Sequence, residues 1–91
     1  MTEISAAVEW SRSRPRFRRL VTELVVKPVR EALSAAPDDA LIRWMLREKA
    51  VMIKARQFVN ALCDSDELRD EYFRCVVQMA MAEVGKPNDG R

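Results

Sequence analysis

The fold is decided by a stretch in the middle of the chain, residues 36–67, which reads APDDALIRWMLREKAVMIKARQFVNALCDSDE. Pro37 closes one helix, and an aspartate after it supplies both the side-chain cap and the negative charge that favour the start of the next helix. Apolar residues then recur at helical spacing as far as about Leu62. Residues 64–67, DSDE, form a capping-box pattern with glutamate at the third helical position, which opens another helix. The stretch therefore predicts two consecutive long helices joined by a short turn.

The residues before this stretch predict a first long helix. Ser13 suits the N-cap and Pro15 the first turn, and the helical pattern continues to about Ala36. Pro28 lies inside this helix, where it lacks an N–H donor and its ring clashes with the preceding turn, so we expect a kink at residues 23–27. A short extra helix is compatible with residues 2–11.

The chain as a whole predicts an all-α fold. The last long helix ends at Gly85, and neither of the two glycines lies in a turn between alternating apolar runs, so strands have little support. Three helices of similar length with short connections predict an up-down-up three-helix bundle with a kinked first helix. Ninety-one residues make one domain, 1–91, with a radius of gyration of about 12 Å. We expect flexible ends at residues 1–14 and 86–91.

The three helices carry more apolar surface than one small bundle can bury. In the first helix, the face expected to be buried comprises Phe17, Leu20, Val21, Leu24, Val25, Val29, Ala32 and Leu33. Val26 lies outside the centre of this face. The second has a main stripe of Leu41, Trp44, Met45, Val51, Met52, Ala55, Phe58, Val59 and Leu62. Because soluble monomers rarely expose large apolar patches, the surplus predicts a partner-binding surface. Its residues are Ile42, Leu46 and Ile53 in the second helix and Phe73, Val77 and Met81 in the third.

This surplus gives the leading hypothesis, a non-enzymatic module that binds a second copy of itself or another protein. An inhibitor of a host protein would need the same kind of surface. The alternative is that the kinked first helix and the N-terminal segment cover the excess. Glu48 lies inside the main stripe, where an unpaired carboxylate would be costly to bury, so we expect it to pair with Arg30 or Arg56.

A cluster of arginines supports a second hypothesis, nucleic-acid binding. Residues 1–30 hold seven basic and three acidic residues, a net charge of +4, so the remainder of the chain, with a total of +2, carries −2. Guanidinium groups bind phosphate with two hydrogen bonds, and an interleaved Phe17 could stack on a base. The candidate contacts are Arg12, Arg14, Arg16, Arg18 and Arg19, extended by a basic strip of Arg43, Arg47 and Lys54.

The same cluster has other interpretations, namely a solvated helix start or a clamp on an acidic protein surface. Positive charge in the first turn of a helix opposes the helix dipole at a cost of about 0.3 to 1 kcal/mol. Something must offset that cost. An external anion is one candidate, and the internal candidate is the acidic patch of Asp64, Asp66, Glu67, Asp70 and Glu71.

The sequence offers little for catalysis, metal or cofactor binding. It has no histidine, no glycine-rich phosphate loop, and only Cys63 and Cys75, which are too few for a zinc site and too far apart in a helical hairpin for a disulfide. Residues 47–49, Arg-Glu-Lys, are similar to the charged residues of all-α chorismate mutases but lack their spacing. We therefore expect no enzyme, no metal and no cofactor. No secretion signal and no membrane span is visible, which predicts a cytoplasmic protein.

Part of the chain resembles a group of viral proteins. Glu9-Trp10 and Phe17, followed by the runs 39–43 (DALIR) and 54–60 (KARQFVN), resemble small helical proteins encoded in bacteriophage head and virion gene modules. The resemblance covers about residues 8–62, is one of general style, and carries over no functional residues. It implies a role in virion assembly and a location in the host cytoplasm or the virion.

Overall fold

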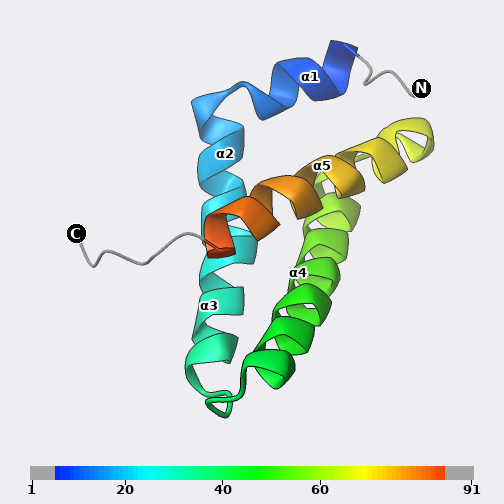
Figure 1. Cartoon of the computed structure of the whole chain (residues 1–91). Helices are drawn as coiled ribbons and strands as arrows, with labels where there is room; N and C mark the ends of the chain where they lie inside the picture. Colours follow the sequence, from blue (N-terminus) through cyan, green and yellow to red (C-terminus); the bar gives the residue numbers. More distant parts are fainter. Residues whose placement is uncertain (1–5, 86–91) are drawn as a thin grey trace.

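The computed structural model describes residues 6–85 and is helical over most of that range (Figure 1). The helices are α1 (Ala6–Arg12), α2 (Pro15–Val21), the π-helical turn η1 (Thr22–Val26), α3 (Lys27–Ser34), α4 (Ala40–Leu62) and α5 (Asp66–Gly85). The predicted all-α class is confirmed. The ends expected to be flexible lie partly outside the described residues, at 1–5 and 86–91, whereas residues 6–12 form α1.

The first long helix is α2, η1 and α3 in continuous sequence, interrupted where the sequence predicts a kink. Pro28 has no N–H to donate to the carbonyl four residues earlier, and the turn before it is π-helical, with the Lys27 N–H bonded to the Thr22 carbonyl. A π turn advances the chain by more residues than an α turn does. Val25 and Val26 are therefore both fully buried, whereas Leu20 and Leu24 are exposed, which corrects the expected buried face.

The long helices do not run side by side along their whole length. α4 returns along α3, and α5 then folds back on the C-terminal half of α4, passes α1 and ends across η1 and α2 (Figure 1). The N-terminal half of α4 is consequently left beside α3 and away from α5. The radius of gyration is 13.7 Å and the extents are 40 × 27 × 26 Å, so the chain is less compact than expected because this end of α4 projects.

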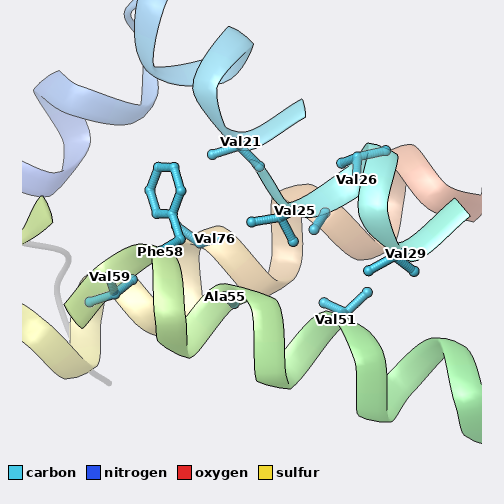
Figure 2. Close-up of a cluster of buried hydrophobic side chains, with 10 residues drawn as sticks. Val21, Val25, Val26, Val29, Val51, Ala55, Phe58, Val59 and Val76 are labelled. Atoms are coloured by element: carbon cyan, nitrogen blue, oxygen red, sulfur yellow. The ribbon is translucent and has the colours of Figure 1, made fainter. Parts of the chain in front are cut away.

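Small side chains dominate the core, where η1, α4 and α5 meet (Figure 2). Its ten buried residues are Val21, Val25, Val26, Val29, Val51, Ala55, Phe58, Val59, Val76 and Ala80. Seven of them are valines, which lets the helices approach closely but fills only a small volume. Phe17 packs against this core, and its ring lies edge-on to the Phe58 ring at a centroid distance of 5.9 Å.

The helix starts follow local sequence signals, with two corrections. Asp39 caps α4 by accepting a hydrogen bond from the Ile42 amide at 3.0 Å, as predicted. In α5 the cap is Ser65, which accepts a hydrogen bond from the Leu68 amide at 3.3 Å, so Leu68 and not Glu67 takes the third helical position and the predicted capping box is wrong. Ser13 does not cap α2, because its hydroxyl donates to the Trp10 carbonyl at 2.8 Å.

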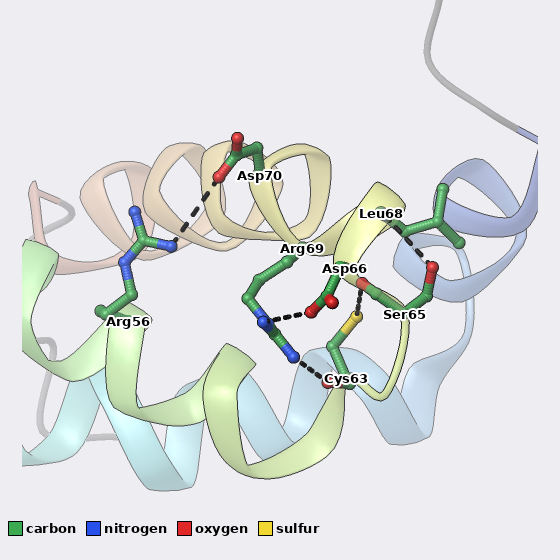
Figure 3. Close-up of polar contacts among 7 residues, drawn as sticks. All are labelled: Arg56, Cys63, Ser65, Asp66, Leu68, Arg69 and Asp70. Carbon is green, nitrogen blue, oxygen red and sulfur yellow. Dashed lines mark hydrogen bonds and ion pairs between the residues drawn. The ribbon is translucent and has the colours of Figure 1, made fainter.

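Arginine side chains hold the ends of three long helical segments. The Arg43 guanidinium donates to the Leu33 carbonyl at 2.8 Å, and that of Arg30 donates to the Glu83 carbonyl at 2.6 Å. Arg69 donates to the Cys63 carbonyl at 3.2 Å while it pairs with Asp66 (Figure 3). These contacts satisfy carbonyls at helix C-termini, where positive charge is favoured by the helix dipole.

Candidate functional site

The largest group of exposed apolar side chains lies on the N-terminal half of α4. We call it the α4 apolar surface, and its residues are Leu41, Ile42, Trp44, Met45, Leu46, Met52 and Ile53. Each of them is between 40% and 66% exposed. They point to more than one side of the helix, and a helix segment that is apolar on most sides is normally buried. Within residues 6–85, nothing covers this segment completely.

The crossing of α5 explains why much of this surface is uncovered. Leu41, Met45 and Met52 follow one another at helical spacing and continue the side of α4 that carries Ala55 and Val59. Ala55 and Val59 are buried in the core, whereas the earlier residues of the same stripe are exposed. The main stripe was expected to be buried throughout, and for Leu41, Trp44, Met45, Met52 and Leu62 that expectation is wrong.

Glu48 lies in the middle of this exposed stripe. We expected a buried carboxylate paired with Arg30 or Arg56, but Glu48 is exposed and forms no ion pair with any residue from 6 to 85. Arg30 is instead bonded to the Glu83 carbonyl, and Arg56 lies 3.9 Å from Asp70. The charge needs no internal partner because its part of the stripe faces solvent.

The residues predicted to bind a partner fall into two sets with different exposure. Ile42, Leu46 and Ile53 are exposed on α4. Phe73, Val77 and Met81 on α5 are only half-buried and pack against the core. The Arg56 guanidinium also covers the Phe73 ring, with its central carbon 3.9 Å from the ring centroid. The α4 set is thus the more accessible of the two.

The residues predicted to bind nucleic acid are likewise not brought together. Arg43, Arg47 and Lys54 are half-buried, and Arg43 is held at the α3 C-terminus. Arg47 buries its Nε without a hydrogen-bond partner among the described residues. The exposed members of the cluster, Arg14, Arg16, Arg18 and Arg19, lie at the start of α2, near the opposite end of the α2–α3 segment (Figure 1). The predicted basic strip therefore does not extend the arginine cluster.

The acidic patch does not neutralise the arginine cluster. Within residues 6–85, Asp66 pairs with Arg69 at 2.6 Å and Asp70 lies 3.9 Å from Arg56, and neither carboxylate pairs with residues 12–19 (Figure 3). Among the described residues, the one ion pair of the cluster joins Arg12 to Glu9, with Nε and Oε1 2.6 Å apart. The sequence suggested either the acidic patch or an external anion as the counter-charge of the arginine cluster. Among the described residues, Asp66 and Asp70 do not fill that role.

Both cysteines are free, as expected from their separation. Cys75 is buried, and burial raises the pKa of its thiol from the ordinary value of 9.0, with a smaller lowering by Arg12 and a smaller raising by Glu9. A neutral buried thiol is a poor nucleophile. Among the described residues, no three cysteine, aspartate or glutamate side chains are grouped closely enough to hold a metal ion.

Trp10 is the functional candidate that sequence reasoning missed. The sequence placed Trp10 only within a short extra helix, but its ring is 62% exposed, and the Arg14 guanidinium carbon lies 4.8 Å from the ring centroid. Arg14 lies after the end of α1, as the extended N-cap of α2, so helical spacing in the sequence could not have shown this contact.

No helix in the part of the chain from 6 to 85 has the length and apolar character needed to cross a membrane. Comparison with protein-family models, with curated proteins and with solved structures found no match to this chain.

Proposed function

We propose that this chain is a non-enzymatic helical module that works by binding protein through the α4 apolar surface. The observation that carries the proposal is the distribution of apolar side chains by size. The core is filled mainly by valine and alanine, while seven larger apolar residues of α4 face solvent. Burying a large apolar side chain contributes about 1.5–3 kcal/mol, so leaving seven of them in water is a cost that a partner can recover.

The composition of this surface supports a protein partner. Aromatic residues and methionine are enriched in protein interfaces, and the surface contains Trp44, Met45 and Met52. Methionine side chains adapt to varied partner shapes. The resemblance to phage head and virion proteins favours an assembly role, in which the partner is a second copy of the chain or another virion component.

Solution mass tests the proposal directly. Size-exclusion chromatography with light scattering should give a mass that is a multiple of the 10.5 kDa chain when the partner is a second copy. Leu46→Glu and Ile53→Glu should reduce that mass to one chain, because each places a charge inside the interface. Helicity and melting temperature should stay close to those of the unaltered chain.

Asn60→Asp is the matched control. Asn60 is exposed on α4, lies seven residues after Ile53 on the same side, and falls outside the apolar surface. It should leave the mass unchanged although it adds the same charge. If Leu46→Glu and Ile53→Glu instead lower the helicity and the melting temperature along with the mass, these side chains support the fold. That result would contradict the proposal. If the unaltered chain is a monomer, cross-linking through Trp44 replaced by a photoreactive residue should capture a different protein.

A further inference from the structure

A concave feature lies where α1, α2 and α5 meet, away from the α4 apolar surface. It is an open cleft of about 1130 Å³, which we call the arginine cleft. Trp10, Arg12, Arg18 and Arg19 line it from α1 and α2, and Met79 and Glu83 line it from α5. The cleft therefore combines three guanidinium groups, an indole ring and a methionine side chain.

The arginines of this cleft differ in how they are held. Glu9 fixes Arg12 through two contacts, at 2.6 Å to Nε and at 3.1 Å to one terminal nitrogen. Arg18 and Arg19 are exposed, and neither forms an ion pair with any residue in the range 6–85. Arg18 and Arg19 are adjacent in α2, so two positive charges lie close together at this cleft. Asp66 and Asp70 pair with Arg69 and Arg56, so among the described residues both guanidinium groups remain accessible to an anionic ligand.

The indole ring adds a second and independent element. Trp10 is among the most exposed large apolar residues of the described chain, and it lies at the cleft and not on the α4 apolar surface. The Arg14 guanidinium that contacts its ring adds positive charge beside the cleft. An aromatic face next to guanidinium groups suits a ligand that has both a planar ring and an anion.

We propose that the arginine cleft binds a nucleotide, with its phosphate held by Arg18 and Arg19 and its base stacked on Trp10. Guanidinium groups bind phosphate oxygens through paired, charge-assisted hydrogen bonds, and a base gains stacking on an indole ring whatever its identity. Glu83 and Glu9 also line the cleft, so the lining has a net charge of only +1. That balance favours a single phosphate at the site over a run of phosphates. The nucleotide can be a free molecule or one unit of a single strand.

Calorimetric titration of the full chain tests this inference with adenosine monophosphate and with a single-stranded oligonucleotide as separate probes. We expect saturable binding at low salt with at least one of them. In a Trp44→Phe background the remaining tryptophan is Trp10, and its fluorescence should be quenched as the site fills. Arg18→Ala and Arg19→Ala should each weaken binding about tenfold, since each removes charge-assisted hydrogen bonds.

Arg16→Ala is the matched control. It removes the same charge from the same helix, and Arg16 is exposed but does not line the cleft. It should change the affinity by less than about twofold, because an exposed charge outside the site acts only at long range. Trp10→Leu should weaken binding about tenfold or more through lost stacking. Far-ultraviolet circular dichroism of each variant would confirm that it is folded.

The probes distinguish the sources of the nucleotide. Tighter binding of the oligonucleotide, with a steep loss of affinity as salt rises, identifies a single strand as the ligand, whereas comparable affinities identify a free nucleotide. Absence of saturable binding of either probe at low salt overturns the inference. So does equal weakening by Arg16→Ala and Arg18→Ala, which would reduce the effect to general positive charge. None of these results depends on the α4 apolar surface, so the two proposals stand or fall separately.

Discussion

Two neighbouring residues of α4 should respond very differently to truncation to alanine. Val51 is 0% exposed in the core, whereas Met52 is 48% exposed on the α4 apolar surface. Val51→Ala removes two methyl groups, which at about 0.8 kcal/mol each gives about 1.6 kcal/mol of lost transfer free energy. The cavity left in a close-packed core adds to this, so we expect a loss of about 2 kcal/mol or more.

Met52→Ala should cost less in the isolated chain although it removes more atoms. About half of the methionine surface is already in water, which limits the loss of transfer free energy to about 1 kcal/mol. The better helix propensity of alanine offsets a small part of that. A chain of this size is expected to have a free energy of unfolding of about 5–14 kcal/mol, so both variants should remain folded.

Urea unfolding followed by circular dichroism measures both differences. At low protein concentration Val51→Ala should lower the free energy of unfolding at least twice as much as Met52→Ala does, and it should lower the melting temperature by about 10 °C. At high concentration the gap should narrow if the chain self-associates, because a covered Met52 then contributes more. Equal losses at low concentration, or a loss below about 0.5 kcal/mol for Val51→Ala, would refute the division between core and surface.

Four further predictions concern contacts that hold α1, α3 and α5 and the two cysteines. Ser11 and Tyr72 share a hydrogen bond of 2.7 Å. In a double-mutant cycle of unfolding, Ser11→Ala and Tyr72→Phe should therefore show a coupling energy of about 1 kcal/mol. Strictly additive losses of the free energy of unfolding would argue against the hydrogen bond. Arg43→Ala should lower the free energy of unfolding by about 0.5–1.5 kcal/mol without weakening nucleotide binding, and weaker binding would place Arg43 in the ligand site. Burial raises the pKa of Cys75 in the folded chain, so the Cys75 thiol loses its proton first in the unfolded chain as pH rises. The contribution of Cys75 to the free energy of unfolding should therefore be constant well below pH 9.0 and should fall above it. Cys75→Ala should remove this fall above pH 9.0. Under native conditions a thiol reagent should modify the half-buried Cys63 before the buried Cys75, and the reverse order would contradict the burial of Cys75.

The elements of the fold could be predicted because their signals are local. Pro15 starts α2, Asp39 caps α4 and Ser65 caps α5, and each acts within one turn of its own position. The break before Pro28 was predictable for the same reason, since the missing donor affects only the preceding turn. Its π-helical form was not, and that form decides that Val26 is buried and Leu24 is exposed.

The buried faces could be predicted only in part because they depend on how helices cross. The periodicity of α4 correctly placed Val51, Ala55, Phe58 and Val59 in one stripe, and all four are buried. The same periodicity extends to Leu41, yet nothing in a helical repeat tells where along the stripe a partner helix stops covering it. The direction of α5 sets that limit, and it is a property of the whole assembly of helices.

The candidate sites show the same division between local and non-local information. The arginine cluster was visible as a run of residues, but its geometry depends on α1 folding back so that Trp10, Arg12 and Arg18 line one cleft. The expected neutralisation by the acidic patch failed because Asp66 and Asp70 find nearer arginines in the α4–α5 hairpin. Charge patterns in the sequence therefore located the arginine cluster but not the ion pairs that the acidic residues form within the chain.

The size distribution of apolar residues also bears on how folding and binding are divided in this protein. Apart from Phe58, the core consists of valine and alanine and excludes the larger exposed residues of α4, so η1 is buried against α4 and α5 within a single chain. Trp44, Met45 and Leu46 lie outside that core and add little to it. Exposed large apolar side chains promote aggregation, so these residues are a cost to the isolated chain. Charged substitutions on the α4 apolar surface should therefore separate binding from stability, whereas substitutions of the core valines should not.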